Sequence, residues 1–326
     1  MLRTVQTRFI SCLYLEAQRK GMVITMNNRE LLPKEGNWYK ANLHCHTVIS
    51  DGTWTKEQVK EEYRKKGYSI VAFTDHRCYG WHPELQDENF LPIAGFEADM
   101  DEPYRIPGDW NRCKTYHLNF YDTNPTNHTD FVAPQPPQRY GDMYSLNGFV
   151  KELNEQGFLC CYNHPFWSLQ NYDDYKDLRG LFAMEIYNHG CELDGLYGYA
   201  SQSYDEMLRT GMQLACLATD DNHDCHPLGD PLNDSFGGWT VIRAQALTYP
   251  DVMDALQKGA FYASTGPELK ELFIQDNALH IKCSPVEKIY IITESRSCKM
   301  KLALPGETIE EAVFPLTGNE GYIRVD

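Results

Sequence analysis

The stretch "ANLHCHTVISDGTW" (residues 41–54) places two histidines, one residue apart, at the end of an apolar run, with an Asp-Gly turn shortly after them. In an extended chain the side chains alternate between two faces, so His44 and His46 point the same way and Cys45 points to the opposite face. The pattern therefore predicts a strand that ends in two ligands for one metal ion, with Asp51 in the following turn. A polar strand end that binds nothing would have the same local sequence, so the decision depends on the rest of the chain.

Six further short apolar runs follow, and segments with helical periodicity lie between them. The expected strands are Tyr39–His44, Ser69–Thr74, Phe90–Glu97, Thr115–Tyr121, Phe158–Tyr162, Leu181–Tyr187 and Leu214–Thr219. The expected helices are Lys56–Lys66, Leu146–Gln156, Tyr204–Thr210 and Pro250–Lys258. This alternation predicts a parallel α/β architecture. Links into the strands are short and segments leaving them are long, as in β/α barrels, whose active sites are built from the loops after the strands.

The pattern changes near residue 267, which predicts two unequal parts. Residues 31–267 are expected to form the barrel domain. Residues 268–326 alternate in short segments with turns and without a long helix, which predicts a small antiparallel β module. This segment stops at Asp326 within an expected strand, as a truncated end would.

Residues 1–30 are expected to be an N-terminal extension rather than a signal peptide. Glu16 and Lys20 follow the short apolar patch too soon, and no small-residue cleavage site is present. Met22 and Met26 are alternative start positions.

Composition limits the class of protein. The formal net charge of −16 argues against a broad nucleic-acid or acidic-membrane footprint and leaves only short oligonucleotides as nucleic-acid partners. No run approaches the roughly 18 apolar residues of a membrane span. The 11 cysteines are odd in number and contain no C-x-x-C pair, which favours reduced thiols in a cytoplasmic protein.

Nearly every expected strand delivers a metal-ligand type of residue to the same end of the barrel, and six of the 11 histidines lie there. The candidates are His44, His46, Asp51, His76, Glu97, His117, His164, Asp221 and His223. Imidazoles mixed with carboxylates, without a thiolate pattern, favour Zn, Mn or Fe. Nine candidates exceed the needs of one ion and suit two or three divalent ions roughly 3.5–4 Å apart. His117 has the least distinctive surroundings, and His128 in the following loop is its alternative.

Other polar residues near these strand ends have supporting roles in this interpretation. Asp75 and Asp220 are each adjacent to a ligand candidate and are the candidates for supporting a catalytic metal-bound water; Asp75 is expected either to point away from the ion or to orient a histidine ligand. Glu185 is expected to be a supporting or structural carboxylate. The candidates for substrate contact are Arg77, His189 and His226.

The motif order H-x-H…S-D-G, T-D-H, G-x-E, H, N-H-P, D-x-H resembles the PHP (polymerase and histidinol phosphatase) superfamily of metal-dependent phosphoesterases over roughly residues 38–267. The segments "GYSIVAFTDH", "AMEIYN", "ATDDNH" and "GAFYASTGPE" resemble its CehA/McbA-like branch, in which a β module follows the barrel. The resemblance implies a distorted seven-stranded (β/α) barrel, PHP- or TIM-like, with a trinuclear site.

The same resemblance implies how the ligands are shared. One ion would take His44, His46, Glu97 and Asp221. A second would share Glu97 and take His117 and His164. A third would take Asp51, His76 and His223.

The expected function is hydrolysis of a small phosphomonoester or nucleotide-like phosphoester by a water that the ions activate. A small anionic, phosphorylated substrate is the expected partner, and the sequence does not predict an oligomeric state. The alternatives are hydrolysis of a non-phosphate ester or carbamate at the same site, a nuclease for short oligonucleotides, and a metal-stabilised binding protein without catalysis.

Overall fold

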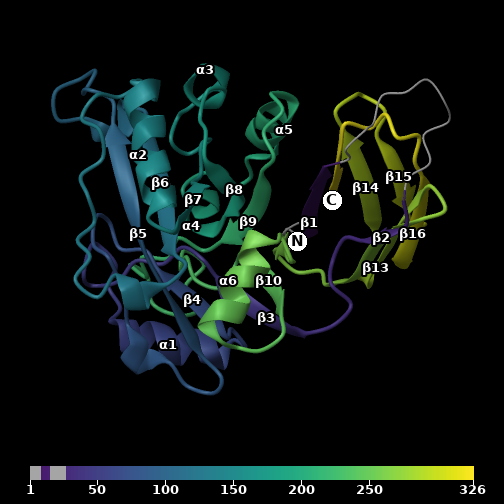
Figure 1. The fold of residues 1–326 in the computed structure, drawn as a ribbon, viewed down its shortest axis with the longest axis horizontal. Coiled ribbons are helices and arrows are strands. Elements are labelled where there is room, and N and C mark those ends of the chain that lie inside the picture. Colours follow the sequence, from purple (N-terminus) through teal and green to yellow (C-terminus); the bar gives the residue numbers. More distant parts are fainter. Residues whose placement is uncertain (1–8, 15–26) are drawn as a thin grey trace.

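The computed structural model describes residues 9–14 and 27–326, which form a barrel-like α/β part beside a group of antiparallel strands (Figure 1). The seven expected strands are present as β3 (Asn37–Asn42), β4 (Ile70–Phe73), β5 (Leu91–Asp101), β6 (Thr115–Asp122), β7 (Phe158–Tyr162), β8 (Leu181–Asn188) and β9 (Ala215–Thr219). Two more strands, β10 (Trp239–Ala244) and β11 (Phe261–Ser264), continue the sheet beyond β3, and β9 packs near both. The nine strands form a nearly closed, barrel-like sheet, so the expected count of seven is not confirmed.

The alternation of strands and helices predicted strands that all run in one direction. The structure differs from this prediction. Strands β3, β4 and β5 are parallel to one another, as are β7, β8 and β9, but β6 is antiparallel to both of its neighbours. In the β5–β6 register Asp99 pairs with His117. Because β6 is reversed, its first residues lie at the same edge as the last residues of the parallel strands. His117 therefore reaches the expected edge from the beginning of its strand.

The four expected helices are confirmed as α1 (Lys56–Lys65), α2 (Met143–Glu155), α5 (Ser201–Arg209) and α6 (Tyr249–Gln257). Helix α1 begins at a capping box in which Thr55 and Gln58 satisfy each other's backbone N–H groups. Its inner face buries Val59 against an apolar cluster that includes Cys45, the cysteine expected to face away from the histidines.

Short helices occupy the loops between these elements. They are α3 (Tyr172–Tyr175), α4 (His189–Leu193), η1 (Pro83–Leu85), η2 (Trp110–Arg112) and η3 (Pro125–Asn127). Four of them lie in loops that follow parallel strands on the ligand side of the sheet: η1 after β4, η2 after β5, α3 after β7 and α4 after β8. The cysteines that the structure describes are all free thiols.

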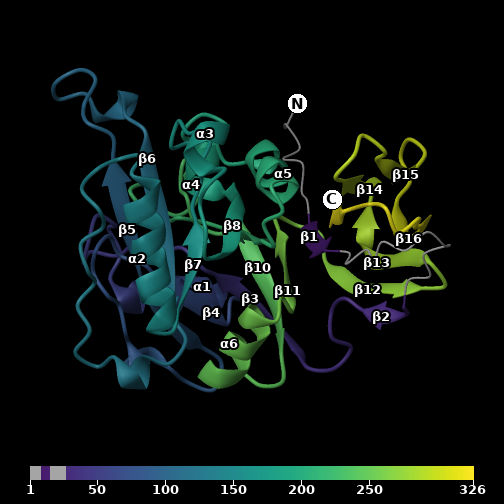
Figure 2. The same ribbon diagram turned by 45° about the horizontal axis from the view of Figure 1, so that its top comes forward.

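The second part of the chain is antiparallel, as expected, and Figure 2 shows it beside the barrel. Strands β12 (Leu269–Gln275), β13 (Ala278–Val286), β16 (Ile309–Pro315) and β2 (Arg29–Glu30) form one four-stranded sheet. Strands β14 (Lys288–Thr293), β15 (Lys299–Leu302) and β17 (Tyr322–Val325) join the large sheet through β1 (Phe9–Tyr14), which pairs with both β17 and β11. The domain boundaries at residues 30 and 267 stay predictions.

The alternative starts at Met22 and Met26 lie outside the described residues. Within the ranges 9–14 and 27–326, no helix combines the length and the apolar character that crossing a bilayer requires.

Candidate metal centre

Backbone hydrogen bonds join the segments that follow β3 and β9. The Asp221 N–H donates to the His44 carbonyl at 3.0 Å, and the His46 N–H donates to the Asn222 carbonyl at 3.1 Å. In each of the pairs His44/His46 and Asp221/His223 one residue separates the two ligand candidates. The two pairs therefore come from segments that run side by side.

His44 and His46 are fully buried, and their Nε2 atoms lie 3.1 Å apart. His44 Nδ1 lies 2.7 Å from the carboxylate of Glu185, which can only accept, so Nδ1 carries the hydrogen. His46 Nδ1 lies 3.4 Å from Ser50 Oγ, whose own hydrogen goes to Asp75 at 2.7 Å. This assignment leaves two Nε2 lone pairs facing each other in a buried site. A cation between them satisfies both, so these residues fit a bound metal ion.

The carboxylate of Glu97 on β5 is fully buried and lies within 3.7 Å of five imidazole nitrogens. Its Oε1 atom lies 3.1 Å from His117 Nδ1, 3.4 Å from His44 Nε2 and 3.7 Å from His164 Nε2. Its Oε2 atom lies 3.2 Å from His76 Nδ1 and 3.3 Å from His46 Nε2. Glu97 Oε2 and His76 Nδ1 are buried without a hydrogen-bond partner. Buried polar atoms are rarely left unpaired. A cation bound between this carboxylate and the imidazole would explain why neither atom has a hydrogen-bond partner.

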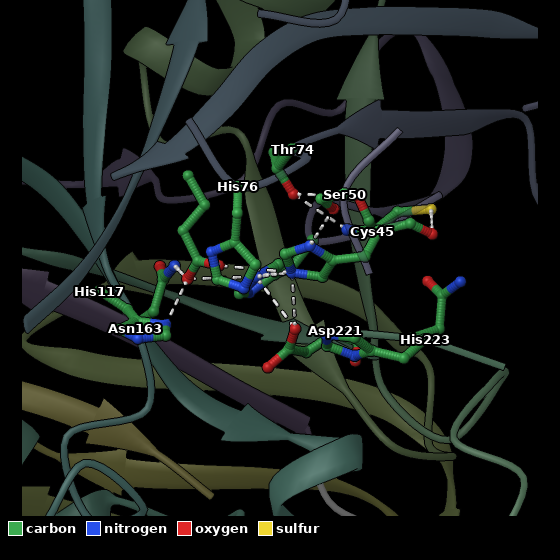
Figure 3. A network of polar contacts seen from close by, with 12 residues as sticks. Cys45, Ser50, Thr74, His76, His117, Asn163, Asp221 and His223 are labelled. Atoms are coloured by element: carbon green, nitrogen blue, oxygen red, sulfur yellow. Dashed lines mark hydrogen bonds and ion pairs between the residues drawn. The ribbon is translucent and has the colours of Figure 1, made fainter. Parts of the chain in front are cut away.

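Figure 3 shows the carboxylate of Asp221, from the segment after β9, joined to the same network. Its Oδ1 atom is 3.1 Å from the Nε2 atoms of both His44 and His46, and its Oδ2 atom is 3.6 Å from His164 Nε2. The backbone has positive φ at three non-glycine residues near these strand ends: +53° at Asp221, +23° at His164 and +56° at Arg77. Such conformations cost on the order of 1–3 kcal/mol each and cluster at functional sites.

A more exposed group lies on the outer side of His46. Asp51 Oδ1 is 3.5 Å from both His46 Nδ1 and His223 Nε2, and Asp51 Oδ2 is 3.6 Å from His76 Nε2. The rings of His46 and His223 are stacked with centroids 4.3 Å apart. The side chain of Asp51 is 54% exposed, so this group faces solvent where a substrate could enter.

Electrostatics in the cluster favour added positive charge. Burial lowers the pKa of His44, but the carboxylates of Asp221, Glu97 and Glu185 outweigh it and raise that pKa well above its usual range. Burial raises the pKa of Glu97 and Asp221, but the surrounding imidazoles outweigh it and hold both pKa values well below the usual range. For His223, burial is likewise outweighed by the carboxylates of Asp51 and Asp221, which raise its pKa to about 9. Divalent cations supply the charge that this field attracts.

The nine ligand candidates are thus all brought together, and they form overlapping compact groups. Within each group the ligand atoms lie within 4.8 Å of one another: His44, His46 and Asp221; His46, Asp51, His76 and His223; His44, Glu97 and His164; His76, Glu97 and His117. The first contains three of the four residues expected for one ion, without Glu97, and the second contains the three residues expected for another ion together with His46. The division of the nine residues among two or three ions stays a prediction.

His128, the alternative to His117, lies elsewhere. Its Nδ1 atom is 2.8 Å from Asp122 Oδ2, and its ring stacks on Phe158 at 5.2 Å. His117 is therefore the residue that joins the cluster.

The two expected supporting aspartates hold loops rather than imidazoles directly. Asp75 accepts hydrogen bonds from the N–H of Thr47 at 2.8 Å and from the N–H and hydroxyl of Ser50 at 3.1 and 2.7 Å, and through Ser50 it reaches His46. Asp220 accepts from three consecutive backbone N–H groups of residues 236–238. Burial raises the pKa of Asp220 to about 6, although these hydrogen bonds act to lower it.

Glu185, expected to be a supporting or structural carboxylate, contacts His44. It accepts from His44 Nδ1 and from Thr219 Oγ1, both at 2.7 Å. Three further residues that contact the ligand candidates were not identified as such from the sequence, because nothing local distinguishes them from ordinary residues. Asn163 Nδ2 donates to Glu97 Oε1 at 2.7 Å. The further partners are Asn188, which donates to both Glu185 and Asp221, and Cys191, which forms a compact group with His164 and Asp221. Burial and nearby carboxylates raise the pKa of the Cys191 thiol well above its usual range, which disfavours a thiolate ligand.

A cavity of about 1080 Å³ opens over the ligand cluster. Arg77 lines it, with its Nε–H donating to Asp99 at 2.9 Å, and His226 lines it from an exposed loop. His189, the third candidate for substrate contact, is not among the lining residues; its ring packs against Gly237, and burial lowers its pKa. Its Nδ1 atom lies 3.1 Å from the Tyr187 hydroxyl, so a substrate role for His189 is not favoured.

No family model matches the sequence, and no curated protein matches it. Among solved structures, the chain is similar to a two-domain protein from Bacteroides vulgatus that contains a PHP-like metal-dependent phosphoesterase, with a TM-score of 0.47 and 15% identity over 93% of this chain and 90% of that one. It is also similar to a metal-dependent phosphoesterase from Bifidobacterium adolescentis, with a TM-score of 0.38 and 16% identity over 62% of this chain and 94% of that one. The names of both proteins give these activities as predictions.

Proposed function

We propose that the protein is a metal-dependent phosphoesterase of the PHP superfamily, from its CehA/McbA-like branch, that hydrolyses a small phosphomonoester or nucleotide-like phosphoester. Two or three ions of Mn, Zn or Fe would be held by the nine ligand candidates. The proposal includes a cytoplasmic location and a barrel domain over residues 31–267.

One observation carries the proposal. The buried Nε2 atoms of His44 and His46 face each other at 3.1 Å, and Asp221 Oδ1 lies 3.1 Å from each of them. Three ligand atoms that converge on one point inside a protein, with the hydrogens of both imidazoles used on the other side, suit a transition metal better than a hydrogen-bond network.

Bound divalent ions would lower the pKa of a water and neutralise phosphoryl oxygens. The chain's own residues fix the geometry for this chemistry. Glu185 and Ser50 hold the imidazoles of His44 and His46 with Nε2 directed inward, and Asn163 holds Glu97 Oε1. The more exposed Asp51 group lies at the cavity side, where a phosphate would arrive.

Arg77 is proposed to bind a phosphoryl oxygen. It follows His76 directly and lines the cavity, and Asp99 fixes its guanidinium through two N–H groups. A guanidinium has five N–H donors, so others stay available for a phosphate.

The test combines metal analysis with a substrate panel. The purified protein is expected to contain close to two or three equivalents of Mn, Zn or Fe and to cleave phosphomonoesters faster than carboxylesters or carbamates. His44→Ala is expected to lose bound metal and turnover, whereas His280→Ala on β13 is expected to keep both.

The outcomes separate the alternatives. Metal-loaded protein that cleaves only carboxylesters or carbamates favours that hydrolase, and protein that cleaves only oligonucleotides favours the nuclease. Loaded protein without turnover on any of these favours a binding protein. Unchanged metal content in His44→Ala contradicts the site assignment.

A further inference from the structure

One of the compact ligand groups is more exposed than the others, and we call it the outer group: His46, Asp51, His76 and His223. Side-chain exposure is 54% at Asp51, 29% at His223 and 24% at His76, whereas the side chain of His44 is fully buried. Asp51 and His223 also come from loops, after β3 and β9, and not from the strands themselves. Ligands that are solvated and carried by loops move more easily when no ion is bound. We therefore expect the outer group to hold its ion more weakly than the buried groups do.

The imidazole of His223 is oriented by the backbone of its own loop. Its Nδ1 atom lies 3.0 Å from the carbonyl oxygen of Asp221, which can only accept, so Nδ1 carries a hydrogen and Nε2 is directed at the outer group. Nε2 lies 3.5 Å from Asp51 Oδ1, and the ring stacks on that of His46. The place of this ligand atom therefore depends on the position of the backbone at residues 221–223.

Asp234 fixes this backbone from the far end of the same loop. Its Oδ2 atom accepts from the His223 N–H at 2.8 Å, and its Oδ1 atom accepts from the Asp224 N–H at 2.9 Å. Hydrogen bonds to an ionised acceptor are roughly twice as strong as those between neutral groups. Asp234 also lines the cavity, but both of its oxygens are used on the backbone. It therefore acts on the outer group through His223 and not as a ligand.

A second carboxylate closes the loop in the opposite sense. Asp220, just before the loop, accepts from the N–H groups of residues 236–238, just after it. The loop between these two carboxylate contacts includes Asp224, a residue other than glycine with a φ of +55°. Such conformations persist only where the surrounding contacts over-determine them. The two hydrogen bonds accepted by Asp234 are among the contacts that hold this backbone in place.

The same backbone is joined to the loop that carries Asp51. The Thr53 N–H donates to the His223 carbonyl at 2.8 Å, and Thr53 Oγ1 donates to the Asp224 carbonyl at 2.5 Å. A shift of residues 223–224 would therefore displace both loops. Asp221 is held separately, through the hydrogen bond of its own N–H to the segment after β3, so the buried groups would keep their geometry.

We propose that Asp234 is the positioning residue of the outer ion site. It holds the backbone of His223 and, through Thr53, the loop of Asp51, and so sets the affinity for the most weakly held ion without contacting that ion. This assignment rests on the proposed function for the place of the ion. It adds that the outer ion can be lost while the buried ions stay bound.

Titration of metal-free protein with MnCl2, followed by the EPR signal of free Mn²⁺, tests the proposal without substrate. The wild-type protein is expected to bind Mn²⁺ in a tight class and a weaker class. Asp234→Ala is expected to lower the affinity of the weaker class by about 10–100-fold, the range typical of changed ligand-orienting partners, and to leave the tight class unchanged. Asp234→Asn keeps the size of the side chain but turns an NH2 group toward one of the two N–H groups, so it is expected to lower the same affinity.

Asp230→Ala is the matched control. Asp230 lies in the same loop, and its carboxylate also accepts a backbone N–H, from Leu232 at 2.9 Å, but it is not among the described residues that line the cavity. Circular dichroism of each variant checks the fold. Mn²⁺ binding that is the same in folded Asp234 variants as in Asp230→Ala overturns the proposal. Equal loss of both classes, or a single class in the wild-type protein, overturns it as well.

Turnover separates this proposal from the proposed function. If Asp234→Ala loses the weaker Mn²⁺ class but the wild-type protein cleaves no phosphoester, the proposed function fails and the positioning role stands. If the wild-type protein cleaves phosphomonoesters but Asp234→Ala binds Mn²⁺ as Asp230→Ala does, the positioning role fails alone.

Discussion

Replacing Glu185 by glutamine should weaken metal binding although Glu185 is not a ligand candidate. Its buried carboxylate accepts four hydrogen bonds: from His44 Nδ1 and Thr219 Oγ1 at 2.7 Å, from Asn188 Nδ2 at 2.9 Å and from the His164 N–H at 3.2 Å. A glutamine side chain has one oxygen and one NH2 group of the same size. Whichever way the amide turns, its NH2 group faces two donors.

The two orientations of the amide have different costs. If the NH2 group faces His164 and Asn188, two buried donors lose their acceptor, at about 1–3 kcal/mol each. If it faces His44, that imidazole must move its hydrogen to Nε2, the atom that would bind the ion. Changes in such orienting partners typically cost about 10–100-fold in metal affinity. We therefore expect a loss of metal affinity in this range, together with a loss of stability.

Competition for Zn against a chromogenic chelator measures the affinity, and urea unfolding of metal-free protein measures the stability. Glu155→Gln on the exposed side of α2 is the control, because its carboxylate is 67% exposed and far from the cluster. Wild-type zinc affinity in Glu185→Gln would refute the reasoning, even if the variant were less stable.

Three further results are expected. Asp205→Ala should cost about 1–3 kcal/mol in urea unfolding, because the buried guanidinium of Arg324 loses two 3.0 Å hydrogen bonds to that carboxylate and keeps its ion pair with Asp326 at 3.1 Å; a loss of a few tenths of a kcal/mol would contradict this. Gly238→Ala should lower Tm, since a Cβ there would lie 2.5 Å from the Thr219 carbonyl oxygen. In Gly148→Ala within α2 the added Cβ meets nothing within 4 Å, and the free energy of unfolding should rise by up to about 1 kcal/mol. Equal effects of the two substitutions in thermal melts would contradict this. Removing metal with a chelator should lower Tm, and ions added at 100 times Kd should restore about 2.7 kcal/mol, so a chelator-insensitive Tm would argue against a bound ion.

The ligand cluster could be predicted because its information is local. Period two places His44 and His46 on one face, and Asp221 and His223 share the same spacing. Strand β9, which precedes Asp221 and His223, is a nearly continuous apolar run, as strands buried on both faces are. Strand β3, which precedes His44, contains Asn37 and Lys40 and gives a weaker signal. The expected helices were found to within a few residues, since their apolar positions recur with helical spacing; α2 begins at Met143, three residues before the expected Leu146.

Strand direction and strand partners could not be predicted, because neither leaves a local signal. The reversal of β6 depends on its pairing with β5. The addition of β10 and β11 depends on the pairing of β10 with β3, which joins residues about 200 positions apart in the sequence. His189 looked equivalent to His226 in sequence, since both follow strands in loops. In the structure His189 begins α4 with its ring against Gly237, whereas His226 lines the cavity.

The position of β1 between β11 and β17 bears on how the chain folds. Residues 11–14 pair with residues 322–325, so this ladder closes a loop of almost the whole sequence. Contacts of such long separation are costly in chain entropy and slow to form. Synthesis of β1 precedes that of both its partners, and until they appear its N–H and C=O groups stay open to pairing with another chain. During synthesis residues 11–14 of β1 therefore stay unpaired until β17 is made. In refolding of the full chain the same ladder still requires closure of this long loop, so we expect aggregation to depend on how fast β17 pairs with β1.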